Sequence, residues 1–217
     1  MPDWEKRHAD LLRVLSHDLG APLRHVVSFA ELLADQDAGL DEKSREWVNY
    51  VRDSGQLAQA MLAGMLELSR TQQREASTES IRIRDWAQEF SARRELPIAI
   101  EGRADDSTPG SSIEADPERL TRALDALLDN AQEWGDGGQL CLQISQERVE
   151  LQVKQAADAL SADDFVRACV PFDRLRRRPT LDHVGMGLTI ALALTESFGG
   201  TLELIDDGIA LTLRQTP

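Results

Sequence analysis

The feature that most constrains the fold is the stretch from residue 3 to residue 74, which has helical spacing and one internal proline, Pro22. Apolar residues in its first half recur at intervals of three and four, at Leu12, Leu15, Leu19, Leu23, Val26, Ala30 and Leu33. Its second half repeats that spacing at Trp47, Val51, Leu57, Met61, Met65 and Leu68. Because a polar, glycine-containing break at residues 37–41 separates the two halves, the sequence predicts a helical hairpin.

A lone hairpin buries little apolar surface, so we expect two copies of the chain to pair into a four-helix bundle, which makes the protein a homodimer. Residues 71–78 are polar and lack periodicity, which predicts a linker. Beyond it, strand-like runs occur at residues 81–83, 97–100, 139–145, 149–154, 201–205 and 209–213. Helical stretches occur near residues 84–94, 117–134, 163–169 and 187–198.

This order predicts an α+β protein with two domains, the hairpin at residues 1–74 and an α/β sandwich at residues 79–217. The helix expected from Pro117 has the clearest start signal, since Asp116 is a typical N-cap and proline is favoured at the first helical position.

The charge balance argues against nucleic acid and anionic lipid as partners, because 38 acidic residues outweigh 24 basic ones and give a net charge of -14. A short basic cluster at residues 174–178 is the local exception. Cys141 and Cys169 lack the spacing of a disulfide framework or a zinc site and are expected to be buried. No membrane-length apolar run or signal-peptide layout is visible, so we expect a cytoplasmic protein without a membrane segment.

His17 is the first candidate catalytic residue. On a helix it lies about 200° from both Leu15 and Leu19, which predicts a side chain that points toward solvent. The neighbouring Asp18 is placed to orient the imidazole and take its proton. Pro22 removes a helical hydrogen bond at a cost of about 3 kcal/mol, which favours a functional site over an ordinary surface histidine.

The run Ser-His-Asp-Leu-Gly-Ala-Pro-Leu at residues 16–23 resembles the H-box of two-component histidine kinases. This resemblance implies that His17 accepts a phosphoryl group and passes it to an aspartate of a response-regulator receiver domain, with Asp18 as acid/base partner. Gly20 departs from the family pattern, which commonly has a basic residue there. Ala21 stands where the family places a Thr or Asn for phosphatase activity, so that activity is not expected.

The second segment resembles the GHKL-type ATP-binding domain of these kinases. Residues 124–131 resemble the N-box, in which Asn130 would contact the magnesium ion and the phosphates. The first N-box asparagine is replaced by Ala126, and the usual basic residue is replaced by Glu133, which would repel a triphosphate.

The glycine-rich boxes are also altered. Gln155 stands where the family has the aspartate that binds adenine, and alanines replace the glycines that follow it. Gly185 and Gly187 resemble the second glycine-rich box, whose third glycine is replaced by Thr189, and they precede a helix whose N-terminus can face an anion. Residues 170–174 resemble the F-box.

These features predict a phosphorelay protein of histidine-kinase architecture, whose own ATP and magnesium binding is weak or lost. Phosphotransfer would need no cofactor from this chain, because a receiver domain brings its own Mg²⁺. The partners expected are a second copy, receiver domains and an upstream kinase. Two alternatives stay open: an ATP-dependent kinase that autophosphorylates His17, and a non-catalytic scaffold that binds response regulators.

Overall fold

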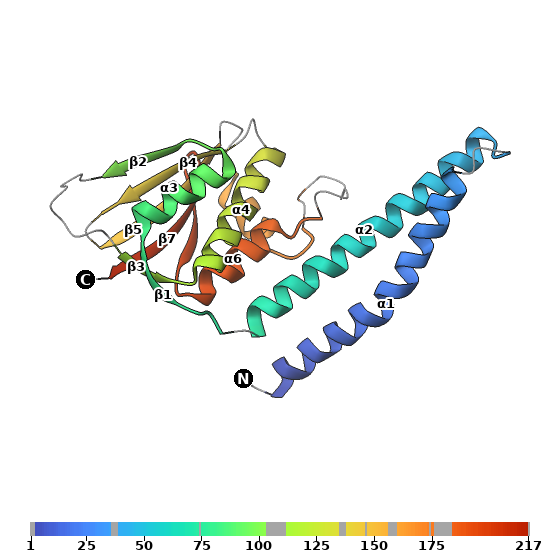
Figure 1. Cartoon of the computed structure of the whole chain (residues 1–217), viewed down its shortest axis with the longest axis horizontal. Helices are drawn as coiled ribbons and strands as arrows, with labels where there is room; N and C mark the ends of the chain where they lie inside the picture. Colours follow the sequence, from blue (N-terminus) through green and yellow to red (C-terminus); the bar gives the residue numbers. More distant parts are fainter. Residues whose placement is uncertain are drawn as a thin grey trace.

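The computed structural model describes residues 3–35, 39–73, 75–102, 112–134, 138–145, 147–155, 160–173, 175 and 184–216. The first half is a hairpin of two long helices, α1 (Asp3–Asp35) and α2 (Glu42–Gln73), which extends away from the second half (Figure 1). The backbone N–H of Ser44 donates to Asp41 Oδ1 at 2.7 Å at the start of α2. The predicted hairpin is therefore confirmed.

The two helices pack through a narrower seam than the sequence spacing predicts. Val27 and Ala30 of α1 are buried, and a Cβ at Gly55 of α2 would lie 2.8 Å from Cγ2 of Val27. Val26 and Leu33, which belong to the same apolar spacing in the sequence, are 44% and 49% exposed. The α1 helix thus carries two adjacent apolar stripes, one against α2 and one that faces outward within a single chain.

The second half is an α+β sandwich, as predicted. Its elements in chain order are β1 (Glu79–Arg82), α3 (Ile83–Arg94), β2 (Ile98–Gly102), β3 (Ser112–Ala115), α4 (Pro117–Trp134), β4 (Gly138–Ile144), β5 (Arg148–Gln155), α5 (Ala162–Ala168), α6 (Gly187–Ser197), β6 (Thr201–Ile205) and β7 (Gly208–Thr216). The described strands pair in the order β1-β3-β7-β5-β4-β2, and β6 pairs with β7. The β2 and β4 strands are parallel, whereas the other pairs are antiparallel.

Helices α3, α4 and α6 cover one face of this sheet (Figure 1). Inward-facing residues of the strands and helices form one core, whose largest fully buried members include Ile83, Ile113, Leu120, Leu124, Leu127, Leu140, Leu142, Leu151 and Leu211. Alternation along β5 puts Val149, Leu151 and Val153 on the covered face. The sheet thus supports α4 and α6, which pack against each other.

Two sequence expectations need correction. The predicted linker is too long, because α2 continues to Gln73 and only residues 75–78 of it are described as irregular. Thr71 lies within α2, where its hydroxyl donates to the Glu67 carbonyl at 3.0 Å and its side chain is buried. The strand β3 was missed, since four residues with one apolar alternation carry little signal.

Candidate functional site

The stretch around His17 lies within α1, which runs through Pro22 as one helix. The side chain of His17 is outside the described part of the chain, so the predicted solvent orientation is untested. Asp18 is exposed and Gly20 and Ala21 are half-buried. Gly20 and Ala21 therefore lie at the margin of the hairpin.

Helix register places the His17 backbone along the hairpin. Val27 packs on Gly55, and Gln56 Nε2 donates to Glu31 Oε1 at 3.3 Å, which fixes the antiparallel alignment. His17 is ten residues before Val27, and Met65 is ten residues after Gly55. Because both helices rise by about 1.5 Å per residue, the backbones of His17 and Met65 lie at the same level.

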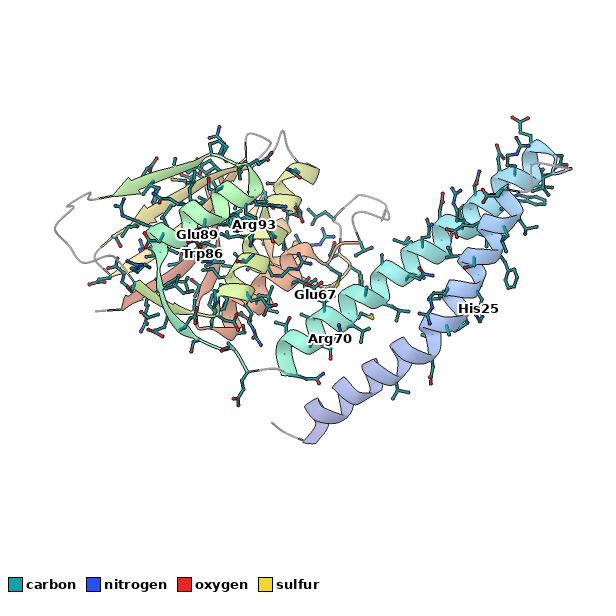
Figure 2. All side chains as sticks on the ribbon, viewed as in Figure 1. His25, Glu67, Arg70, Trp86, Glu89 and Arg93 are labelled. Carbon is teal, nitrogen blue, oxygen red and sulfur yellow. The ribbon has the colours of Figure 1, made fainter. Side chains whose placement is uncertain are left out.

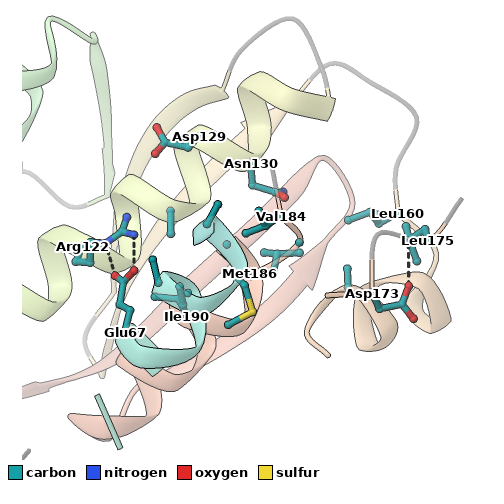
Figure 3. Close-up of a pocket in the computed structure, with 18 residues that line it drawn as sticks. Glu67, Arg122, Asp129, Asn130, Leu160, Asp173, Leu175, Val184, Met186 and Ile190 are labelled. Carbon is teal, nitrogen blue, oxygen red and sulfur yellow. Dashed lines mark hydrogen bonds and ion pairs between the residues drawn. The ribbon is translucent and has the colours of Figure 1, made fainter. Parts of the chain in front are cut away.

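A cavity of about 330 Å³ lies at that level, between α2 and the second half of the chain (Figure 3). Its α2 wall is made of small residues and one carboxylate: Ala60, Ala63, Gly64 and Glu67. Its α4 wall is made of Arg122, Ala126, Asp129 and Asn130. The remaining lining comes from α6 and the segments before it: Leu160, Ala168, Asp173, Leu175, Val184, Gly185, Met186, Gly187, Leu188 and Ile190.

The two halves meet through direct contacts at this cavity. Glu67 of α2 accepts two hydrogen bonds from Arg122 of α4, at 2.7 Å from Nε and 3.1 Å from Nη2. Figure 2 shows Glu67 on the part of α2 beside the second half, whereas His25 lies on α1, away from it. A Cβ at Gly64 would lie 2.8 Å from Cγ of Met186, so glycine is required for this close approach. One ion pair and one close approach at a small residue thus contribute to the docking of α2.

The described charges on the cavity lining are mostly acidic. Asp129 binds Arg94 at 2.8 Å, and Asp173 binds Arg167 at 3.1 Å. The Leu175 backbone N–H donates to Asp173 at 2.8 Å and, together with Arg167, holds the pKa of Asp173 below its usual value. The hydrogen bond to Glu67 raises the pKa of Arg122 further, so this guanidinium is always charged.

The start of α6 forms one end of the cavity. Gly185 has φ of 76°, a left-handed conformation that favours glycine. Met186 is the N-cap, and no side chain caps this helix end. The Thr189 hydroxyl, which stands where the family has a third glycine, donates to the Cys169 carbonyl at 3.0 Å. Thr189 therefore anchors the end of α5 instead of facing the cavity.

The predicted nucleotide residues come together only in part. Asn130, Gly185 and Gly187 line the cavity with Ala126, as their box positions predict. Gln155 ends β5, and its side chain is outside the described residues. Asp18 is not among the described lining residues.

Sequence reasoning missed Gly64, Glu67, Arg122 and Met186. A signal existed for Arg122, because it lies four residues before Ala126 and eight before Asn130 and so shares their face of α4. Nothing in the local sequence links Glu67 to Arg122, which are 55 residues apart.

Within the described lining, few positive groups are available to a magnesium triphosphate in this docked arrangement. Three carboxylates, Glu67, Asp129 and Asp173, line the cavity, and its described lining has one cation, Arg122, already paired with Glu67. Within the described residues, no group of three or more His, Cys, Asp or Glu side chains is arranged to hold a metal ion. Among the described lining residues, Asn130 and the uncapped end of α6 can meet a phosphate while Glu67 holds Arg122.

Comparison with known protein families finds a match for each half of the chain. Residues 7–74 match the family described as "His Kinase A (phospho-acceptor) domain", and residues 115–216 match the "Histidine kinase-, DNA gyrase B-, and HSP90-like ATPase" family. In the described part of the chain, no helix is long and apolar enough to cross a membrane.

Two curated relatives are similar over nearly the whole chain. Sensor histidine kinase GlrK of Escherichia coli strain K12 is 27% identical over 211 residues, which cover 94% of this chain and 44% of the relative. Sensor histidine kinase GtrS of Pseudomonas aeruginosa is 27% identical over 209 residues, which cover 94% and 41%. The chain thus spans less than half the length of these relatives.

Among solved structures, the fold is similar to that of Acinetobacter baumannii histidine kinase AdeS, with a TM-score of 0.54. The two sequences are 16% identical, and the match covers 92% of this chain and 97% of AdeS. The fold is also similar to that of full-length ShkA, crystallised with AMPPNP, with a TM-score of 0.56 and 24% identity. That match covers 95% of this chain and 45% of ShkA. With a phospho-acceptor domain followed by a GHKL-type ATPase domain, the chain belongs to the two-component histidine kinase family.

Proposed function

We propose that this chain is a histidine phosphotransferase of kinase architecture, which exchanges a phosphoryl group between His17 and an aspartate of a response-regulator receiver domain. The observation that carries the proposal is that the described charges on the cavity lining are already paired: Glu67 holds Arg122, while Asp129 and Asp173 bind Arg94 and Arg167. Because the described lining has no unpaired cation for a triphosphate, it favours a phosphoryl source other than ATP bound by the chain itself.

In the proposed exchange, an imidazole nitrogen of His17 attacks the phosphorus of the receiver's aspartyl phosphate. A nitrogen–phosphorus bond forms as the acyl oxygen–phosphorus bond breaks, and the aspartate leaves as a carboxylate. Asp18 follows His17 directly, and in this scheme it accepts a hydrogen bond from the other ring nitrogen and stabilises the charge that develops on the ring. The receiver supplies the Mg²⁺ that neutralises the transferring group.

We also propose that the chain acts as a homodimer. Phe29, Leu33 and Val26 of α1 are 65%, 49% and 44% exposed, and Trp47 and Tyr50 of α2 are 61% and 76% exposed. Apolar patches of this kind are unusual on a monomer surface. A second copy that covers these side chains would form the predicted four-helix bundle.

The test is incubation with a receiver domain that has been charged with labelled phosphate. Acid-labile label should move from the receiver to the wild-type chain and not to the His17→Ala variant. Asp18→Asn should slow the transfer without abolishing it. Label that remains on the receiver with the wild-type chain, for a panel of receivers from the same cell, would sink the proposal.

ATP-dependent autophosphorylation is a second candidate function, and one feature favours it. The cavity brings Asn130, Gly185 and Gly187 together beside the uncapped end of α6, at the level of His17 along the hairpin. Helix N-termini favour phosphate groups. Incubation with γ-labelled ATP and Mg²⁺ distinguishes the two, because only an autokinase places label on His17 without a receiver.

A further inference from the structure

The ion pair between Glu67 and Arg122 is the strongest polar link between the hairpin and the ATPase domain in the described residues. The two hydrogen bonds, at 2.7 and 3.1 Å, form a bidentate pair (Figure 3). An arginine fork of this geometry binds a carboxylate or a phosphate in the same manner. Glu67 therefore occupies the part of Arg122 that a phosphate group would use.

Arg122 is placed on the α4 face that lines the cavity. Arg122, Ala126, Asp129 and Asn130 follow one another at helical spacing and all contribute to the lining. Arg122 and Asn130 are eight residues apart, which corresponds to about 12 Å along the helix. An extended phosphate-containing ligand that reaches Asn130 and the start of α6 can therefore also reach Arg122.

The neighbouring arginines on this side have other partners. Arg94 binds Asp125 and Asp129 at 3.3 and 2.8 Å. Arg119 is buried, pairs with Asp116 and donates to the Thr71 carbonyl at 3.4 Å. Among the described residues that line the cavity, Arg122 is therefore the one cation that opening of the α2 contact would release.

We propose that Glu67 is a built-in competitor of anionic nucleotides, which holds Arg122 while α2 is docked and frees it to bind phosphate when α2 moves away. Docking of α2 and binding of a nucleotide then exclude one another. This inference rests on the second candidate function, ATP-dependent autophosphorylation, because it concerns the binding of a nucleotide phosphate by Arg122. It does not depend on phosphotransfer from a receiver.

The pair is exposed enough to open without unfolding the chain. The side chains of Arg122 and Glu67 are 44% and 35% exposed, and ion pairs in such positions contribute little net stability. The contact between Gly64 and Met186 places no further charge at the interface. Loss of the Glu67 charge is therefore expected to act on anion binding more than on folding.

Calorimetry with ADP and Mg²⁺ tests the proposal on the full chain and three variants. Glu67→Gln should bind ADP about tenfold or more tightly than wild type, since a charge-assisted bond to phosphate becomes available. Arg122→Gln also breaks the ion pair but lacks the cation, so its affinity should stay at or below the wild-type value. Glu46→Gln, on an exposed part of α2, is the matched control for the lost charge and should equal wild type.

Pyrophosphate with Mg²⁺ provides a second arm, because it carries phosphates without adenine. If the variants rank in the same order for pyrophosphate as for ADP, the gain in affinity comes from the phosphate groups and not from adenine. Equal ADP affinities of Glu67→Gln and wild type, or no measurable binding by Glu67→Gln, would overturn the proposal. An equal gain in Arg122→Gln would also overturn it, since the gain would then come from undocking alone. Failure of the phosphotransferase function would be seen separately, in the His17 labelling experiment.

Discussion

Asp116 joins two parts of the chain through one buried carboxylate. Its Oδ1 accepts the backbone N–H groups of Glu118 and Arg119, both at 3.1 Å, and so caps α4 as the sequence predicts. Its Oδ2 accepts the backbone N–H of Ser77 at 2.9 Å, just before β1. The helix that carries Asn130 is thus fixed to the segment that follows α2.

Asp116→Ala should therefore destabilise the ATPase domain by about 1–3 kcal/mol, because it removes an N-cap and leaves buried backbone donors unpaired. Urea denaturation followed by circular dichroism measures this change. Asp163→Ala, an exposed position in the first turn of α5, should change the free energy of unfolding by less than about 0.5 kcal/mol. Similar effects of the two substitutions would contradict the capping role.

The two cysteines are predicted to react slowly with a thiol reagent at neutral pH. Cys141 is 3% exposed and Cys169 is half-buried, and both are free thiols. Burial raises the pKa of both, which lowers the fraction of reactive thiolate. Absorbance with Ellman's reagent should show slow reaction in the native chain and rapid reaction of two thiols in urea. Rapid native labelling of Cys141 would show that the sheet opens around it.

At the scale of elements, the α1 and α2 hairpin has one packed stripe and one exposed stripe. Val27 and Ala30 face α2, whereas Phe29 lies on the outward stripe. The sequence spacing cannot separate the two stripes, because positions 26, 29, 30 and 33 lie close together on one face of a helix. Only the folded hairpin distinguishes the side chains that α2 covers from those left for a second copy.

Phe29→Glu should convert the proposed dimer into monomers, because it places a charge in the apolar stripe. Size-exclusion chromatography with light scattering measures the mass at micromolar concentration. Ser28→Glu introduces the same charge at an adjacent exposed position on the polar side of α1 and should leave the mass unchanged. A wild-type chain that is already monomeric would contradict the proposed four-helix bundle.

Elements with strong local signals could be predicted from the sequence. The bounds of α4 follow from Asp116, Pro117 and a long amphipathic repeat, and the structure agrees at residues 117–134. The contacts that build the cavity could not be predicted, because Glu67 and Arg122 meet only after the chain has folded. The role of Thr189 was hidden for the same reason, since its partner is the carbonyl of Cys169.

For the whole molecule, the close contact of Gly64 with Met186 sets how the ATPase domain sits on the hairpin. A Cβ at Gly64 would lie 2.8 Å from Cγ and 3.4 Å from Cβ of Met186, so a larger side chain must push the two halves apart. Glycine is also a poor helix former and costs about 1 kcal/mol of helix stability relative to alanine. The close packing of α2 on Met186 offsets this cost. Replacement by leucine should therefore strengthen α2 while it weakens the docking.

Gly64→Leu should open the molecule without unfolding it. Small-angle X-ray scattering should give a larger radius of gyration, while circular dichroism keeps the helical signal. Met186→Ala removes the atoms that clash, so the Gly64→Leu, Met186→Ala double variant should return toward the compact wild-type profile. The Met186→Ala substitution relieves the clash only if the leucine at position 64 meets Met186. A return of the double variant to the wild-type profile therefore assigns the expansion to this contact. Scattering of Gly64→Leu that matches wild type would mean that α2 and α6 do not dock in solution as they do here.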